Sequence, residues 1–172
     1  MVERASLERK YTFTGIRGSN PFASATNKLV MSDNNDIVKV GLGVIIEKDG
    51  KILIGKRIGS HAPYYSIPGG HLEPGETFEQ GAMREIKEET NLDINDPQVI
   101  AVTNNLETFE KEKIHYISVI LLVKDFNGVP KVMEPDKNES WQWIDPQALP
   151  EPHFDGSQYG VNCYLNKKFY CQ

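Results

Sequence analysis

One helix, preceded by a loop rich in glycine and proline, is the feature that most constrains the fold of this chain. Residues Thr77 to Gln80 match a capping box, in which a threonine and a glutamine side chain each bond a backbone N–H at a helix start. Asn91 tolerates the left-handed backbone that ends a helix, and Pro97 bars much continuation. Apolar residues at every fourth position form the predicted buried stripe of this helix: Phe78, Ala82 and Ile86.

Three glutamates of the predicted helix repel one another. Glu85, Glu88 and Glu89 are spaced i, i+3 and i+4, so their carboxylates share one face, at a cost of roughly 0.2–0.5 kcal/mol per pair. A divalent cation would reverse the sign of that repulsion, and Mg²⁺ takes oxygen ligands of this kind beside substrate phosphates. The plainer alternative is a solvated acidic face that Arg84 and Lys87 neutralise.

Strand-like segments lie on both sides of the helix, at residues 38–47, 51–57, 97–105, 114–125 and 140–144. Asp49-Gly50 is a strong hairpin signal between the first two. The segment 114–125 is apolar on both faces at its centre, which predicts an interior strand. Asp145-Pro146 is typical of the start of a short helix. These elements predict a mixed α/β domain.

The composition fits a soluble domain without a nucleic-acid or membrane partner. The chain has 172 residues and a formal net charge of −5, and it lacks a long basic stripe. Its longest apolar run, residues 117–123, is far too short to cross a bilayer. Cys163 and Cys171 fit neither a disulfide framework nor a zinc site. We therefore expect reduced thiols and a cytoplasmic location.

The first residues of the chain differ in charge from the remainder. Residues 1–30 carry five basic and two acidic side chains, whereas the chain from Met31 on is net acidic. They also lack clear periodicity. We expect residues 1–35 to be a poorly ordered or accessory N-terminal arm and residues 36–172 to form the globular domain. A transit peptide is the alternative for the arm.

The 23 residues GHLEPGETFEQGAMREIKEETNL, numbers 70–92, resemble the Nudix box of the Nudix hydrolase superfamily. Every defined position matches except Asn91, where the family usually has glycine, and asparagine is the non-glycine residue that best accepts positive φ. The flanks GKRIGSHAPYYSIPGGHLEPGET and NESWQWIDPQALP resemble MutT-type nucleoside-triphosphate diphosphatases, closest to the branch that also hydrolyses thiopurine nucleotides. The resemblance covers about residues 38–165. It implies the α/β fold of the family, an α/β/α sandwich with a mixed β-sheet and a loop–helix–loop metal site.

The resemblance also implies roles for individual residues. The predicted ligands of Mg²⁺, or of Mn²⁺ in its place, are Glu85, Glu88, Glu89 and the carbonyl of Gly69. Metals stabilise charge on phosphoryl oxygens and lower the pKa of bound water. The predicted catalytic set is Glu85, which deprotonates the attacking water, with Arg84, which orients Glu85, and Glu88. Glu76 is expected to anchor the loop to the helix.

Further substrate and metal contacts are expected downstream of the box. Among the candidates Glu134, Asp136 and Glu139 for an additional carboxylate, Glu139 is preferred because it precedes the strand that carries two tryptophans. Phe154 and Tyr159 lie where the closest relatives place aromatic residues against a purine, and a tyrosine face can stack on a base. A role for both in the hydrophobic core is the alternative. The four histidines read as ordinary isolated residues, with His115 the exception that could lie in a substrate cleft.

The predicted activity is Mg²⁺-dependent hydrolysis of a nucleoside triphosphate, of a purine or modified base, to the monophosphate and pyrophosphate. A nucleoside diphosphate-X substrate, such as ADP-ribose or a nucleotide sugar, is the alternative enzyme. A non-catalytic nucleotide sensor is a third reading, disfavoured because all the box carboxylates are present. The expected partner is a small-molecule nucleotide, and a homodimer is compatible with the resemblance.

Overall fold

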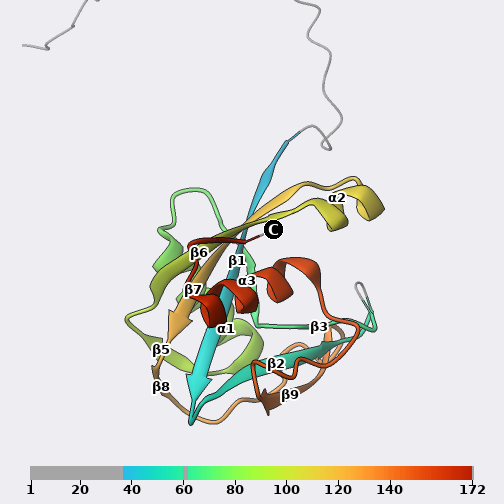
Figure 1. Cartoon of the computed structure of the whole chain (residues 1–172). Helices are drawn as coiled ribbons and strands as arrows, with labels where there is room; N and C mark the ends of the chain where they lie inside the picture. Colours follow the sequence, from blue (N-terminus) through green and yellow to red (C-terminus); the bar gives the residue numbers. More distant parts are fainter. Residues whose placement is uncertain (1–36, 60–61, 172) are drawn as a thin grey trace, which may run out of the picture. The chain divides into compact units, whose positions relative to one another are not determined.

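The computed structural model describes residues 37–59 and 62–171, which belong to one compact unit (Figure 1). The predicted arm at residues 1–35 lies outside the described residues. The elements in chain order are β1 (Lys39–Lys48), β2 (Lys51–Arg57), β3 (Tyr65–Ser66), β4 (Gly69–His71), α1 (Phe78–Thr90), β5 (Asp93–Asn95), β6 (Gln98–Asn105), α2 (Leu106–Glu112), β7 (Tyr116–Val123), β8 (Asp125–Asn127), β9 (Asn138–Ile144), α3 (Asp155–Asn166) and β10 (Tyr170–Cys171).

A mixed sheet forms the centre of this unit, with strand order β10-β6-β7-β1-β2-β3, where β4 pairs with β1 and β9 with β2. Strand β7 runs parallel to β1 on one side and antiparallel to β6 on the other. The prediction of an interior strand there is therefore confirmed. A separate two-stranded sheet joins β5 and β8.

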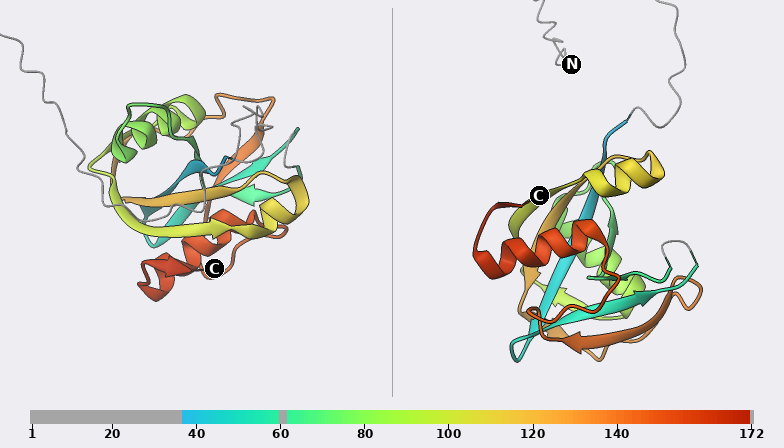
Figure 2. Two further views of the ribbon diagram at one scale, coloured as in Figure 1. Left: turned by 90° about the horizontal axis from the view of Figure 1, so that it is seen from above. Right: turned by 45° about the vertical axis from the view of Figure 1, so that its right-hand side comes forward.

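The helices α1 and α3 cover opposite faces of the sheet, which gives the predicted sandwich of layers (Figure 2). Successive side chains of a strand point to opposite faces. On β1, Val44 and Ile46 accordingly pack in the cluster that contains Ala82 and Ile86 of α1. Ile45 packs instead with Val161 of α3. Each face thus has its own buried apolar cluster.

Local sequence signals explain the turns and the helix ends around the site. Asp49 and Gly50, with φ of 51° and 75°, make the tight turn between β1 and β2. The capping box of α1 is present, because Thr77 accepts from Gln80 N and Gln80 accepts from Thr77 N. Asn91 ends the helix with φ of 59°. These predictions are confirmed.

Three expectations about the fold are wrong, and two helices were missed. Phe78 is 38% exposed, so the buried stripe of α1 runs through Ala82 and Ile86 and then Glu89. Asp145-Pro146 forms a turn, with Ala148 N bonding Asp145 O, and no helix follows there. The helices α2 and α3 were not anticipated. Cys163 and Cys171 are paired as a disulfide that joins α3 to β10, where reduced thiols were expected.

Candidate active site

Helix α1 and strand β4 are joined through two glutamate side chains. The Glu89 carboxylate accepts the backbone N–H of Gly69 at 3.0 Å, and the Glu85 carboxylate accepts the backbone N–H of His71 at 3.1 Å. Gly70 lies between these two anchor points. A Cβ on Gly70 would collide with the Glu85 carboxylate, so any larger residue there would displace that carboxylate. The two carboxylates are therefore held at one edge of β4.

Arg84 positions Glu85 and ties the preceding loop to the helix. Its Nε and Nη2 donate to the two carboxylate oxygens of Glu76 at 2.7 and 2.9 Å, and its Nη1 donates to Glu85 at 2.9 Å. Hydrogen bonds from Arg84, and then from the Glu73 backbone, lower the pKa of Glu76 to about 2. Glu76 is therefore charged at neutral pH, and the contacts predicted for Glu76 and Arg84 are present.

Glu89 is a buried acid, only 5% exposed. Burial raises its pKa to about 7, although the bond from Gly69 N and the charge of Arg57, 3.6 Å away, act in the opposite direction. The negative charges of Glu85 and Glu134 raise the pKa further. A carboxylate held in this way is the kind of group that a cation would stabilise in its charged form.

Glu88 is different, because its side chain is 58% exposed and reaches Arg84 Nη1 at 3.4 Å. Within residues 37–59 and 62–171, no group of three or more His, Cys, Asp or Glu side chains is arranged to hold a metal ion. The donor chemistry nevertheless fits a hard divalent cation, because three carboxylates lie close together. Glu85 and Glu88 both contact Nη1 of Arg84, and Glu85 and Glu89 both accept backbone N–H groups of β4. The metal set stays a prediction.

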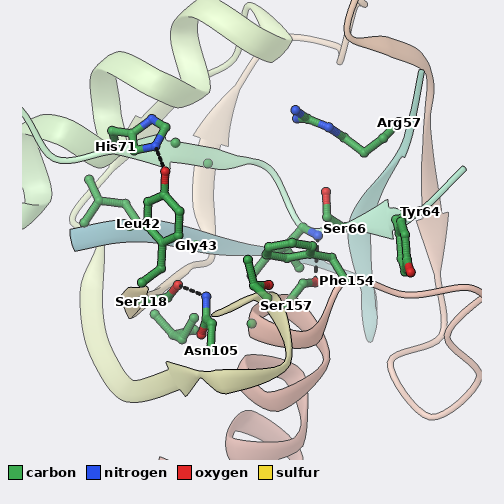
Figure 3. A pocket seen from close by; sticks show the side chains of 18 of the residues that line it. Leu42, Gly43, Arg57, Tyr64, Ser66, His71, Asn105, Ser118, Phe154 and Ser157 are labelled. Atoms are coloured by element: carbon green, nitrogen blue, oxygen red, sulfur yellow. Dashed lines mark hydrogen bonds between the residues drawn. The ribbon is translucent and has the colours of Figure 1, made fainter. Parts of the chain in front are cut away.

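A pocket of about 210 Å³ is lined in part by strand β4, to which Glu85 and Glu89 are bonded (Figure 3). Backbone of β1 and β4 forms part of it, including Gly43 and Gly69. Its wall contains aromatic rings, buried or half-buried polar side chains, a basic residue and a histidine: Tyr64, Tyr116, Phe154, Asn105, Ser118, Ser157, Arg57 and His71. Such a mixture of apolar surface and few polar groups is typical of small-molecule sites.

The structure separates the predicted substrate contacts. Phe154 and Gly69 line the pocket, whereas Tyr159 and Glu139 do not. The Tyr159 hydroxyl donates to Glu107 at 2.8 Å, and this bond raises the pKa of Tyr159 to about 12. Glu139 forms an ion pair with Lys56 at 2.7 Å. His115 does not line the pocket either, and its Nε2 lies 2.6 Å from Asn104 Oδ1.

Among the downstream acids, Glu134 lies nearer to the carboxylate site than the preferred Glu139. The loop that carries Glu134 is bonded to the end of α1, because Met133 N donates to the main-chain oxygen of Glu89 at 3.2 Å. Both acids form ion pairs, Glu134 with Lys137 at 2.6 Å and Glu139 with Lys56 at 2.7 Å, but of the two it is Glu134 whose charge raises the pKa of Glu89. Spacing along the chain does not reveal this, because the loop folds back onto the helix.

Several pocket residues were missed from the sequence. Asn105 donates to Ser118 Oγ at 2.9 Å, and Ser157 bonds His153 at 2.7 Å. They come from β6, β7 and the start of α3, where single polar residues carry no local signal. Only the topology brings them together.

Known proteins are similar to this chain in sequence and in fold. A model of the NUDIX domain matches residues 38–162. An ADP-ribose pyrophosphatase of Methanocaldococcus jannaschii is 35% identical over 120 residues, which are 67% of this chain and 67% of that protein. The NAD-capped RNA hydrolase NudC of Vibrio atlanticus is 30% identical over 112 residues, 63% of this chain and only 38% of that protein.

The crystal structure of a MutT NUDIX hydrolase from Burkholderia pseudomallei has a TM-score of 0.67 at 28% identity, covering 73% of this chain and 97% of that chain. In the part of the chain that the structure describes, no helix is long and apolar enough to cross a membrane. The match over residues 38–162, together with these relatives, shows that the chain belongs to the Nudix hydrolase family.

Proposed function

We propose that the chain is a metal-dependent pyrophosphohydrolase of nucleoside triphosphates, which releases the monophosphate and pyrophosphate. The observation that carries this proposal is the position of the pocket, which shares Gly69 and Gly70 with the strand that anchors Glu85 and Glu89. A nucleoside in the pocket would place its phosphates at these carboxylates. Hydrolysis would then occur at the phosphate chain.

The size and lining of the pocket support a single nucleoside. Its volume of about 210 Å³ is below the roughly 300–1,000 Å³ of sites for drug-sized ligands. Phe154 and Tyr64 offer aromatic faces on which a base can stack. Arg57 and His71 line the pocket (Figure 3). Each is also close to a glutamate, because Arg57 Nη1 lies 3.6 Å from Glu89 and His71 N donates to Glu85 at 3.1 Å. We place the phosphate chain on that side.

Glu85, Glu88, Glu89 and the Gly69 carbonyl would hold Mg²⁺, or Mn²⁺ in its place, which would neutralise phosphoryl oxygens and acidify bound water. Glu85 takes the proton of the attacking water, and Arg84 holds its carboxylate in place through the 2.9 Å bond. Glu88 contacts the same Arg84 nitrogen as Glu85 and completes the proposed catalytic set. Glu134 is our candidate for the additional carboxylate.

A nucleoside diphosphate-X compound is the second candidate substrate. The relative from Methanocaldococcus jannaschii is named an ADP-ribose pyrophosphatase, and it is 35% identical to this chain. The pocket favours the triphosphate, because its volume leaves little room for a second sugar. The relative from Vibrio atlanticus adds a capped RNA end as a third compound for the test.

A hydrolysis panel with Mg²⁺ tests the proposal. The panel contains the canonical deoxynucleoside and nucleoside triphosphates, 8-oxo-dGTP, ADP-ribose, a nucleotide sugar and NAD-capped RNA, with pyrophosphate and orthophosphate measured separately. Pyrophosphate release from one triphosphate well above all other compounds is the expected result. Turnover confined to ADP-ribose, the nucleotide sugar or the capped RNA would contradict it. Chelation of the metal should abolish turnover.

Three further assignments stay proposals. We place the protein in the cytoplasm, although a disulfide such as the one between Cys163 and Cys171 is rare there, and we treat residues 1–35 as an accessory arm. A homodimer is tested by the mass of the protein in solution.

A further inference from the structure

A buried histidine lies behind the wall of the pocket and is not used by the carboxylate site. His153 is 6% exposed and precedes α3. The chain around it is bonded to β3 on both sides, because Tyr65 N donates to Pro152 O at 2.8 Å and Phe154 N donates to Tyr65 O at 2.9 Å. The main chain of His153 is therefore held in a fixed position.

The contacts of His153 determine which ring nitrogen carries the proton. Nδ1 lies 3.3 Å from the carbonyl oxygen of Pro150, which can only accept a hydrogen bond. Burial lowers the pKa of His153, so the neutral ring is favoured. A neutral imidazole has one donor and one acceptor nitrogen. Nδ1 is therefore the donor, and Nε2 is an acceptor.

This tautomer fixes the direction of the Ser157 hydroxyl. Ser157 Oγ lies 2.7 Å from His153 Nε2, so the hydroxyl proton of Ser157 is donated to the ring. The same Oγ accepts the backbone N–H of Ile67 at 2.9 Å. A hydroxyl has one donor and two acceptor positions. With these two partners, one acceptor position of Ser157 is left, on a side chain that lines the pocket.

We propose that Ser157 is a specificity residue that offers the pocket only a hydrogen-bond acceptor and so selects a nucleoside with an N–H or O–H donor at that point. His153 is the positioning residue, because it holds the hydroxyl proton of Ser157 away from the pocket. The inference rests on the proposed function, which places a nucleoside there. Ser157 and Phe154 are drawn on the same wall of the pocket in Figure 3.

Protonation of His153 should reverse this selectivity. An imidazolium donates from both nitrogens, so Ser157 Oγ would accept from Nε2 and from Ile67 N, and its own proton would turn to the pocket. The charged groups near the ring are Glu151, whose carboxylate accepts His153 N at 3.1 Å, and Asp155, which is bonded to Thr108. The strand β3 contributes Tyr65.

Pairs of nucleotides that differ by one donor test the proposal. dGTP and dITP differ in the 2-amine, ATP and purine riboside triphosphate in the 6-amine, and dGTP and ddGTP in the 3′-hydroxyl. For the pair whose donor meets Ser157, kcat/KM of the wild type at pH 8 should fall about tenfold or more when the donor is removed, since an unpaired buried acceptor is costly. Ser157→Ala should reduce that ratio to about twofold or less. Ser140→Ala, outside the pocket, should keep the wild-type ratio.

The pH profile of the wild-type ratio needs no variant and covers the case in which Ser157→Ala does not fold. The ratio should fall as the pH drops through the His153 pKa, whereas a structural role for His153 would leave it constant, because the glutamates act on both nucleotides of a pair equally. Equal ratios at every pH for all three pairs would overturn the proposal. If no triphosphate is hydrolysed, the proposed function fails, and dissociation constants of the same pairs then decide about Ser157. If the ratio of dissociation constants for one pair depends on Ser157, the inference is supported. If none of the three pairs shows such a ratio, the inference is overturned.

Discussion

The carboxylate of Glu89 accepts the backbone N–H of Gly69 at 3.0 Å and is thereby fixed, buried, at the end of strand β4. A buried acid with a pKa of about 7 reduces the stability of the fold whenever it must be charged. This arrangement explains a helix face that repels itself. We propose that the glutamates are placed for a cation, so that the metal-free protein bears this cost in stability.

Glu89→Gln should therefore stabilise the metal-free protein at pH 8. The change from pKa 4.5 in the unfolded chain to about 7 in the fold corresponds to at most about 3 kcal/mol. The penalty appears as the pH rises from 4.5 to 7, because the unfolded chain then loses its proton first, and it stays constant above 7. Below pH 4.5 the variant and the wild type should unfold alike. Thermal unfolding of both proteins without metal, at pH 4 and at pH 8, measures the difference in stability at each pH.

Glu88→Gln is the matched control for this effect. Its side chain is 58% exposed, so removing its charge should change the unfolding temperature little at either pH. An equal stabilisation by both variants would show that general repulsion along α1 is the cause and that the burial of Glu89 is not.

Arg84→Lys should lower kcat by about tenfold or more while KM changes less, because lysine cannot donate to both oxygens of Glu76 and also to Glu85. Steady-state kinetics on the best triphosphate measure this. Lys87→Ala is the control, since Lys87 pairs with Asp93 at 2.9 Å on the exposed side of the helix. A normal kcat in Arg84→Lys would remove Arg84 from the catalytic set.

Phe154→Ala should raise KM about 5- to 150-fold with a smaller change in kcat, if the ring stacks on the base with the roughly 1–3 kcal/mol typical of such contacts. Tyr159→Phe removes only the bond to Glu107 outside the pocket and should leave KM within about twofold. The opposite order of the two effects would restore Tyr159 as the base contact. It would also contradict the position of the pocket.

His153 makes stability depend on pH in the direction opposite to Glu89. Burial lowers the pKa of His153 in the fold, so below the ordinary value of 6.5 the unfolded chain binds more protons than the folded chain. The free energy of unfolding therefore decreases as the pH is lowered from 6.5 to the folded pKa. Urea unfolding of the wild type minus that of His153→Gln, at pH 7.5, 6.5 and 5.5, isolates this contribution. His115→Gln is the control histidine. A difference that is the same at all three pH values would contradict the buried neutral ring.

The box and its helix could be predicted because their signals are local. The capping box at Thr77, the left-handed Asn91 and the turn at Asp49-Gly50 each depend on neighbouring residues and were found in the structure. The prediction that Phe78 is buried was wrong for a physical reason. Periodicity gives the angle between residues on a helix but not how much of that face is covered by the rest of the fold, and Phe78 is left 38% exposed.

The pocket depends on distant parts of the chain and could not be predicted in the same way. Ser157 contacts Ile67 across 90 residues, and Asp155 accepts the hydroxyl of Thr108 across 47. The disulfide between Cys163 and Cys171 also depends on tertiary structure, because the return of β10 along β6 brings the two Cα atoms within 5.7 Å. The spacing of these residues along the sequence predicts none of these contacts.

The most direct test is pyrophosphate release from a nucleoside triphosphate with Mg²⁺, compared between the wild type and Glu89→Gln, each shown to be folded by thermal unfolding. We predict one pyrophosphate per monophosphate for the wild type, no orthophosphate, and a loss of at least about a hundredfold in kcat for Glu89→Gln, since the proposed metal ligand and its charge are removed. Full turnover by Glu89→Gln, or orthophosphate as the product, would contradict the assignment of the site.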